Sequence, residues 1–296
     1  MTLTQLKYII ALAQEKHFGR AADFCCVSQP TLSIGIKKLE DELNMLIFDR
    51  EQNQLATTAK GEVIVQRARQ IVAETDDLKR FANSHDDPLD GVLKLGAIFT
   101  ISPYLMPNLI PKIKQSAPKM PLALYENYTE NLREKIKLGE LDAIVISLPF
   151  AEKGCEVVDL YQEDFVAIFP KEHPLASQKS IQITDIPPKE LLLLGAGHCF
   201  REQILNCYPN RESNAQNLNL FQGNSIETLK QMVITGLGVT ILPKHAANLQ
   251  MDTEQYLCMV PFSNPVPTRT VSLVYKKNFP RIAAIDLLIK TLQCAL

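Results

Sequence analysis

Two cysteines in the stretch GHCFREQILNC, residues 197–207, are of a residue type that could react with one another. Cys199 and Cys207 lie eight residues apart, with His198 before the first and Arg201 two places after it. The thiolate is the reactive form of cysteine, and a nearby cation or a helix N-terminus raises its fraction. Such a thiolate attacks the O–O bond of a peroxide and becomes a sulfenic acid. The alternative is that both thiols are small buried hydrophobic groups, as most cytosolic cysteines are.

The spacing of the two cysteines limits how they can bond. If the segment from Cys199 to Cys207 were one helix, eight steps of ~1.5 Å would separate the two Cα atoms by about 12 Å. A disulfide requires a Cα separation of roughly 4.4–6.8 Å. A disulfide would therefore trap an unwound segment. Closing so short a loop biases the equilibrium by ~2–3 kcal/mol on a chain-entropy model, which is enough to repopulate a two-state domain.

The elements around Cys199 alternate between predicted strands and helices. ELLLLG reads as a strand, a Gly195–Gly197 turn follows it, and Cys199 comes near the start of the next helix. VLKLGAI, LDAIVISL, DFVAIFP and RTVSLVYK are further strands, and SIETLKQMVITG and RIAAIDLLIKTLQC are helices. This alternation predicts a mostly parallel α/β sheet with helices on both faces, in two lobes with a cleft between them. Because no GxGxxG or GxxxxGK[ST] motif is present, we expect no nucleotide cofactor.

The N-terminal segment has the pattern of a helix-turn-helix. Helices are predicted at 3–16, 19–24 and 29–43, and the third begins with Ser28 as a good N-cap and Pro30 in the first turn. A helix that enters the major groove requires small polar side chains early, to reach base edges, and lysines late, to meet phosphates. Candidate contacts to bases and groove are Ser28, Gln29, Pro30, Thr31 and Ser33, and candidate phosphate contacts are Lys37, Lys38 and, in a wing within the stretch 45–61, Arg50. The alternative is an ordinary surface corner with a solvated polar face.

A long helix is predicted to follow, from Thr58 to about Ser84. Its apolar seam comprises Ile64, Ala68, Ile71, Ala73, Leu78 and Phe81. One long helix beside a small domain commonly pairs with a copy of itself. SHDDPLDG at 84–91, rich in Asp and containing Pro88 and Gly91, is a predicted linker.

Composition excludes several classes of protein. A length of 296 residues predicts about two domains, and a net charge of −2 leaves room for only a small nucleic-acid-binding face. No apolar run approaches the ~20 residues of a membrane helix, and the first residues do not form a secretory signal, so we expect a cytoplasmic protein without membrane contacts. The seven cysteines contain no CxxC pair, and we therefore expect no metal site.

The motifs resemble those of a known family. HFGRAADFCCVSQPTLSIGIKKLEDELN is similar to the DNA-binding signature of the LysR-type transcriptional regulators, and the resemblance covers essentially the whole chain. GAIFTISPYLMPNLIP, GHCFREQ and TGLGVTILP resemble the peroxide-sensing members of that family. The resemblance implies a winged helix-turn-helix at 1–58, a dimerising linker helix at 59–87, and a two-lobed regulatory domain at 88–296 that is similar to periplasmic binding proteins. Lobe I would comprise about 88–162 plus 269–296, and lobe II about 163–268.

The same resemblance implies a function. It implies a hydrogen-peroxide-sensing activator, a homotetramer built as a dimer of dimers, switched by oxidation of Cys199 and a disulfide to Cys207 and affecting RNA polymerase at double-stranded DNA. A glutaredoxin or thioredoxin would reset it, and no cofactor is implied. The implied peroxide pocket comprises Thr100, Thr129, His198, Arg201 and Arg269. In these relatives the stretch between the two cysteines is usually one residue longer.

Two alternatives stay open at this point. A LysR-type regulator that senses a small organic ligand in the cleft, with Cys199 incidental, would respond to a metabolite and not to peroxide. A thiol peroxidase would turn over peroxide catalytically with thioredoxin. The helix-turn-helix pattern and the lack of a second substrate site oppose the peroxidase, so we expect a protein that is not an enzyme.

Overall fold

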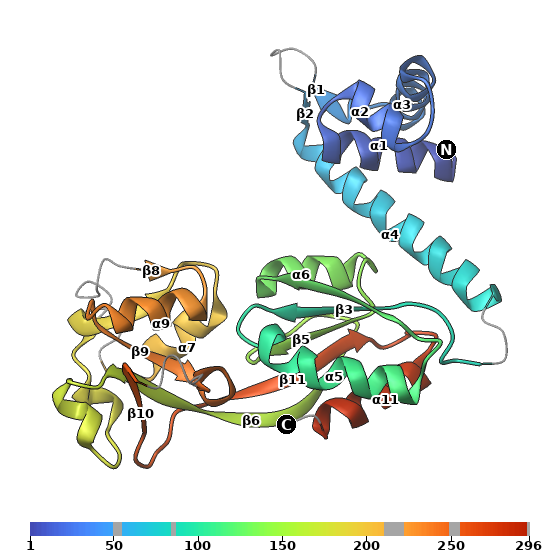
Figure 1. Ribbon diagram of the computed structural model, residues 1–296. Coiled ribbons are helices and arrows are strands. Elements are labelled where there is room, and N and C mark those ends of the chain that lie inside the picture. Colours follow the sequence, from blue (N-terminus) through green and yellow to red (C-terminus); the bar gives the residue numbers. More distant parts are fainter. Residues whose placement is uncertain (50–54, 84–86, 210–221, 249–254, 295–296) are drawn as a thin grey trace. The chain divides into compact units, whose positions relative to one another are not determined.

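The computed structural model describes residues 1–49, 55–83, 87–209, 222–248 and 255–294 (Figure 1). The chain divides into two compact units, one mainly of residues 1–86 and the other mainly of residues 87–296. Within the described residues, no helix combines the length and the apolar character that crossing a lipid bilayer requires.

The N-terminal unit packs three short helices against the start of a long one. Its elements are α1 (Leu3–Glu15), α2 (Phe18–Phe24), α3 (Gln29–Leu43), β1 (Phe48–Asp49), β2 (Ala56–Thr57) and α4 (Ala59–Asn83). Helix α3 begins where the sequence predicts, because Ser28 Oγ accepts from the backbone N–H of Thr31. Leu32, Ile36 and Leu39 form its buried face. The two short strands pair antiparallel, so a helix-turn-helix is followed by a small β-ribbon.

The long helix α4 carries apolar side chains that its own unit leaves uncovered. Ala68 is buried, whereas Ile71 is 40% exposed and Leu78 is 66% exposed. The predicted seam residue Phe81 lies outside the side chains that the structure describes. Exposed apolar groups along one helix are consistent with a partner surface, and pairing of α4 with a copy of itself stays a prediction.

The C-terminal unit is built on one nine-stranded sheet in the order β4-β3-β5-β11-β6-β9-β7-β8, with β10 paired to β6. Its strands are β3 (Leu93–Ile98), β4 (Leu122–Asn127), β5 (Ala143–Ser147), β6 (Cys155–Pro170), β7 (Leu191–Leu194), β8 (Gln222–Gly223), β9 (Val239–Pro243), β10 (Leu257–Pro261) and β11 (Thr268–Lys276). Its helices are α5 (Ser102–Ser116), α6 (Thr129–Lys137), α7 (Cys199–Asn206), α9 (Ile226–Ile234) and α11 (Ile282–Gln293). Short 3₁₀ turns lie at 174–177, 183–185, 188–190 and 244–247.

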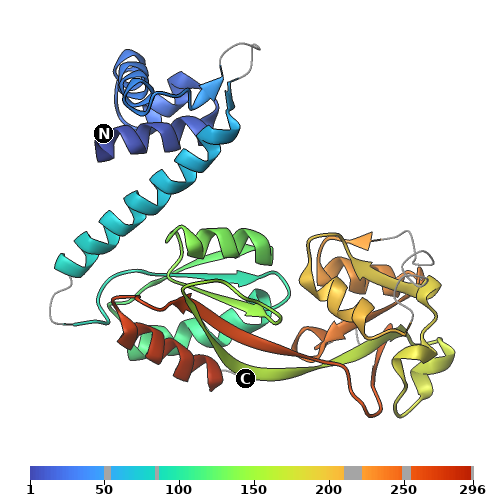
Figure 2. The same ribbon diagram turned by 180° about the vertical axis from the view of Figure 1, so that it is seen from behind.

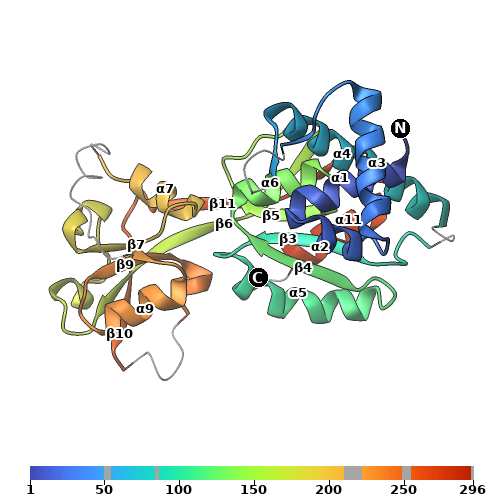
Figure 3. The same ribbon diagram turned by 90° about the horizontal axis from the view of Figure 1, so that it is seen from above.

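Two lobes share this sheet through the long strand β6. Residues 155–164 of β6 pair with β11 in lobe I, and residues 165–170 pair with β9 and β10 in lobe II. Figures 2 and 3 show β6 and β11 as the two strands that connect the lobes. Each lobe has its own hydrophobic core, one around β3, β5, α5 and α11, the other around β7, β9, α7 and α9.

The sheet is mixed, which corrects the prediction of a mostly parallel sheet. Strand β3 is parallel to β4 and β5, and β7 is parallel to β8 and β9, as βαβ connections require. Strand β6, in contrast, is antiparallel to β9, β10 and β11, and β11 is antiparallel to β5. The physical reason is that β6 and β11 carry the chain from one lobe to the other and back.

Candidate functional site

Helix α7 begins at Cys199, directly after a turn that a glycine makes possible. Strand β7 ends at Leu194, and Gly197 has φ +97°, a conformation that L side chains rarely adopt. A Cβ at Gly197 would also lie 3.3 Å from the Tyr128 ring. His198 is the N-cap residue and Cys199 the first helical residue. A glycine is therefore required for the chain to turn here and set the thiol beside the β4–α6 connection.

The Cys199 side chain lines a small recess between the lobes, of a size for a water-sized molecule. Thr100, Thr129 and His198, three of the residues that the resemblance implies for a peroxide pocket, line it too. The remaining lining residues are Ile98, Phe99, Asn127, Tyr128 and Gly197. Most of the lining residues end or directly follow β3 or β4, whose carboxyl ends meet at this edge of the sheet. That strand-end rule is the signal that could have found Asn127 and Tyr128, which the sequence reasoning missed.

His198 is a buried and neutral member of this recess. It is 6% exposed, and its ring lies edge-on to Tyr128 at 4.8 Å and tilted to Phe99 at 5.9 Å between centroids. Burial lowers the pKa of His198 below its ordinary value of 6.5, so the ring is mainly neutral at pH 7. Its Nε2 has no hydrogen-bond partner among the described residues. The cation that we expected beside the sulfur is therefore not His198, because burial removes its charge.

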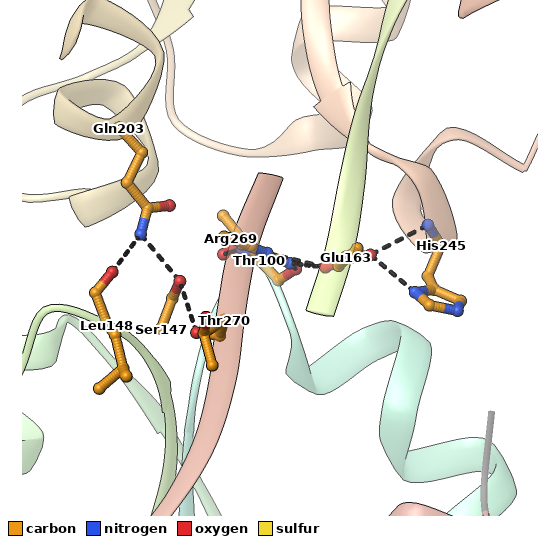
Figure 4. A network of polar contacts seen from close by, with 8 residues as sticks. All are labelled: Thr100, Ser147, Leu148, Glu163, Gln203, His245, Arg269 and Thr270. Carbon is orange, nitrogen blue, oxygen red and sulfur yellow. Dashed lines mark hydrogen bonds and ion pairs between the residues drawn. The ribbon is translucent and has the colours of Figure 1, made fainter. Parts of the chain in front are cut away.

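Arg269 reaches the recess through Thr100 (Figure 4). Its Nη1 donates to Thr100 Oγ1 at 2.9 Å, and its Nη2 donates to the Thr100 carbonyl at 3.0 Å. Its Nε donates to Glu163 at 2.7 Å, and both charged side chains are 1% exposed. Glu163 also accepts from the backbone and the ring Nδ1 of His245, at 3.0 and 2.8 Å. This buried ion pair fixes the Thr100 hydroxyl, and Arg269 is not itself among the residues that line the recess.

Arg201 turns away from the recess. Its Nη1 donates to the carbonyl of Leu194 at 3.0 Å, so it ties α7 to the end of β7. Arg201 is not among the lining residues, although the resemblance implied a place for it in the pocket. The reason is geometric, because residues one and three of a helix point about 200° apart around its axis.

Cys207 lies at the other end of α7, in a different environment. It is the C-cap residue, and its Sγ donates to the Gln203 carbonyl one turn earlier, at 3.1 Å. Burial raises the pKa of the Cys207 thiol. Both Cys199 and Cys207 are free thiols, and a helix of this length separates their Cα atoms by about 12 Å.

The predicted DNA-facing residues share one helix of the N-terminal unit. Ser28, Gln29, Pro30, Thr31, Lys37 and Lys38 are exposed, and Ser33 is half-buried. Arg50 lies outside the described residues. Cys25 packs partly against the helical core, whereas Cys26 is exposed with φ +54° and does not pack that core. Among the described residues, no group of His, Cys, Asp and Glu has the arrangement of a metal site.

Comparison with known families assigns both units. Residues 3–62 match the model "Bacterial regulatory helix-turn-helix protein, lysR family", and residues 86–296 match "LysR substrate binding domain". The chain belongs to the LysR family. Within it, this LysR-family chain is 35% identical over 281 residues to the DNA-binding transcriptional dual regulator OxyR of Escherichia coli K12, covering 95% of this chain and 91% of the relative.

Two further relatives show that this LysR-family chain is similar to more than one kind of regulator. It is 36% identical to a hydrogen peroxide-inducible genes activator of Haemophilus influenzae, covering 95% of this chain and 92% of the relative. It is 34% identical to the HTH-type transcriptional regulator EstR of Acinetobacter baylyi, covering 99% and 96%. Identity alone therefore does not separate the peroxide-responsive relatives from other regulators.

Solved structures of OxyR proteins are similar to this LysR-family chain over its full length. A full-length OxyR of Pseudomonas aeruginosa with a cysteine-to-aspartate change has a TM-score of 0.81 and 44% identity, covering 99% of this chain and 95% of that one. A hydrogen-peroxide-bound OxyR mutant of Corynebacterium glutamicum has a TM-score of 0.66 and 27% identity, covering 99% and 92%. The two-lobed α/β regulatory domain after a helix-turn-helix, predicted from the sequence, is thereby confirmed.

Proposed function

We propose that this chain is a DNA-binding transcriptional regulator that senses hydrogen peroxide by oxidation of Cys199 and disulfide formation with Cys207. The observation that carries the proposal is one juxtaposition. Cys199 lines a water-sized recess together with two threonine hydroxyls and the neutral imidazole of His198, and a second thiol lies at the far end of the same helix. The names of a hydrogen peroxide-inducible genes activator and of a hydrogen-peroxide-bound OxyR among the relatives support the same signal.

The chemistry requires two steps. The Cys199 thiolate attacks one oxygen of the peroxide, the O–O bond breaks, and hydroxide leaves and takes up a proton as water, which leaves Cys199 as a sulfenic acid. The Cys207 sulfur then attacks the Cys199 sulfur, an S–S bond forms, and the sulfenic oxygen leaves as water. Two electrons pass from the thiols to the peroxide in total. A dithiol reductant, a glutaredoxin or a thioredoxin, returns them to reset the switch.

The recess supplies hydrogen bonds to a small uncharged oxidant. The Thr129 Oγ1 is buried without a partner among the described residues, and so is His198 Nε2, so both are available to a bound peroxide. Thr100 already accepts from Arg269, which leaves its hydroxyl hydrogen free to donate. Together these groups would hold the O–O bond beside the sulfur and stabilise the charge that develops on the leaving oxygen. Arg269 acts through Thr100, as a positioning residue.

The output would be a change in how the protein sits on double-stranded DNA. The residues of α3 that would face the DNA are exposed, and the uncovered apolar groups of α4 support assembly with further copies, as a dimer of dimers. Oxidation alters the regulatory domain and thereby the recruitment of RNA polymerase. The chain would act in the cytoplasm, as a regulator and not as an enzyme, because one peroxide is consumed per switching event.

A second candidate function is a response to a small organic ligand between the lobes. The observation that favours it is the match of residues 86–296 to the model "LysR substrate binding domain". A ligand sensor predicts a thermal shift with an organic ligand and none with peroxide. A peroxide sensor predicts a covalent change at Cys199 with one equivalent of peroxide.

A non-reducing tryptic map after one equivalent of hydrogen peroxide tests the proposal. Trypsin cuts after Lys189, Arg201 and Arg211, so Cys199 falls in the peptide 190–201 and Cys207 in the peptide 202–211. We expect these two peptides joined, and separated by reduction, despite the short spacing. Oxidation of Cys199 with Cys207 still a thiol would leave a one-cysteine sensor. No change at either residue would remove the peroxide proposal.

A further inference from the structure

Gln203 connects the middle of α7 to the opposite lobe. Its Nε2 donates to Ser147 Oγ and to the Leu148 carbonyl, both at 2.8 Å. Helix α7 packs into the core of lobe II, whereas Ser147 ends strand β5 of lobe I (Figure 4). Ser147 Oγ in turn reaches the Thr270 carbonyl at 3.3 Å, next to Arg269. One side chain therefore bonds the helix that carries both cysteines to the other lobe.

The backbone of Gln203 holds the second cysteine. Its carbonyl accepts the Cys207 thiol at 3.1 Å, a contact that exists only while the last turn of α7 is helical. Forming the Cys199–Cys207 disulfide requires that turn to unwind, because the helical separation is about 12 Å and a disulfide spans roughly 4.4–6.8 Å. Unwinding around Gln203 moves its side chain and its carbonyl together, so the bonds to Ser147, Leu148 and Cys207 break in one event.

We propose that Gln203 is a latch that holds α7 helical against lobe I in the reduced protein and sets how readily the Cys199 sulfenic acid proceeds to the disulfide. The inference rests on the proposed function and adds a residue that regulates its second step. Gln203 does not line the recess at Cys199, so it does not act on the attack on peroxide. Its own Oε1 is buried without a partner among the described residues, so the latch is incompletely satisfied and opens at lower cost than a fully bonded amide.

The latch stabilises the dithiol and not the disulfide. Removing it favours the disulfide by the strength of the two lost side-chain hydrogen bonds, which is roughly tenfold in the equilibrium constant. For a two-electron couple, a tenfold change lowers the reduction potential by about 30 mV. The sulfenic acid of Cys199 condenses with the Cys207 thiol and releases water in this step, so the reaction needs no reagent beyond the peroxide already consumed.

Gln203→Met tests the latch in the full-length protein. Methionine matches glutamine in length and helix propensity but donates no hydrogen bond. After mixing with peroxide, acid quenching and thiol alkylation, intact mass separates dithiol, sulfenic acid and disulfide over time. We expect the Cys199 thiol to be lost at the wild-type rate. The sulfenic acid should convert to the disulfide about tenfold faster, and the reduction potential should be about 30 mV more negative. Gln231→Met, on the exposed face of α9 in the same lobe, is the matched control and should change neither step.

Ser147→Ala provides the second arm, because it removes one of the two acceptors from the other lobe. Combined with Gln203→Met it should add less than the sum of the single effects, since both changes delete the same bond. Equal acceleration of both steps, or fully additive effects, would overturn the latch. The latch would also be overturned if the wild-type protein forms the disulfide and Gln203→Met converts its sulfenic acid to the disulfide at the same rate. If the wild-type protein forms no disulfide at all, the proposed function itself fails, which is a distinguishable result.

Discussion

Cys199 and Cys207 occupy opposite ends of α7 and pack against different hydrophobic cores. The Cys199 side chain lies against the core of lobe I, and the Cys207 side chain lies against the core of lobe II. A disulfide between them therefore requires more than a local change of helix. At least one thiol must leave the core that holds it, so the bond would couple the oxidation state to the contact between the two lobes.

We expect Cys207→Ser to stop the reaction at its first product. The Cys199 thiol should be lost at the wild-type rate, because Cys207 lies outside the recess where peroxide would bind. The sulfenic acid should then persist, since no resolving thiol is in reach. Trapping with dimedone, detected by intact-mass measurement, would follow the sulfenic acid over time. Cys199→Ser should react with neither reagent, and fast oxidation of that variant at Cys207 would reverse the assigned roles.

The buried Glu163–Arg269 pair should dominate the stability of the hinge between the lobes. Glu163→Gln leaves the Arg269 guanidinium buried without a counter-charge, which costs about 3–5 kcal/mol. For a domain of this size we expect Tm to fall by roughly 10 °C. Glu156→Gln is the matched control, because Glu156 pairs with Lys277 at 3.3 Å on an exposed surface. That variant should lose at most about 1 kcal/mol, and equal losses in both variants would contradict the importance of burial.

His198 should make stability depend on pH. Its pKa in the folded state is lowered from 6.5 by burial, so the unfolded state binds more protons between the two values and stability rises with pH there. The full contribution is present above about pH 6.5 and is lost as the pH falls toward the lowered folded-state pKa. Chemical denaturation of wild type and His198→Phe between pH 8 and pH 5 measures it. The gap in unfolding free energy should move in favour of the variant on acidification, and a constant gap would refute the lowered pKa.

The exposed residues of α3 should divide into two kinds of DNA contact. Lys38→Ala should weaken binding about equally on all sequences and reduce the slope of log K against log salt by about one. Gln29→Ala should instead relax the preference at one base pair, at a cost of about 1–3 kcal/mol on the preferred site. Lys179→Ala, on an exposed lysine of lobe II, is the control and should leave the salt slope unchanged. Salt-dependent binding to a preferred and a scrambled duplex distinguishes the three.

Local features could be predicted from the sequence where the cause is local. Helix α3 begins at Gln29 because the Ser28 side chain caps it and because the first turn of a helix tolerates a proline. Helix α4 extends over nearly the predicted range, since its one glycine, Gly61, lies in the first turn and no proline interrupts its periodicity before the linker. The start of α7 at Cys199 follows from the glycine turn before it. Each of these depends on residues a few positions apart in the chain.

Side-chain partners could not be predicted, because they come from distant parts of the chain. Arg269 lies 169 residues from Thr100 and 106 from Glu163. The pairing of β6 with β11 places Arg269 opposite Glu163, and the strand order β3-β5-β11 brings Thr100, just after β3, within reach. The same holds for Gln203, whose acceptors are 55 and 56 residues away in the other lobe. His198 and Arg201 show that neighbours in sequence can mislead. Both suggested a cation beside Cys199, but burial keeps His198 neutral and the Arg201 side chain points away from the recess.

The sequence by itself determined the candidates and the pattern around them: two thiols eight positions apart, a capped helix with polar residues early and lysines late, and an alternation of strands and helices. These features follow from residue type and spacing, because helix capping and helical periodicity depend on residues that are close together in the chain. Only the tertiary structure decided that the strands linking the lobes are antiparallel, that the two thiols face different cores, and that a glutamine bridges the lobes. Those outcomes depend on burial and long-range packing, which no local spacing encodes.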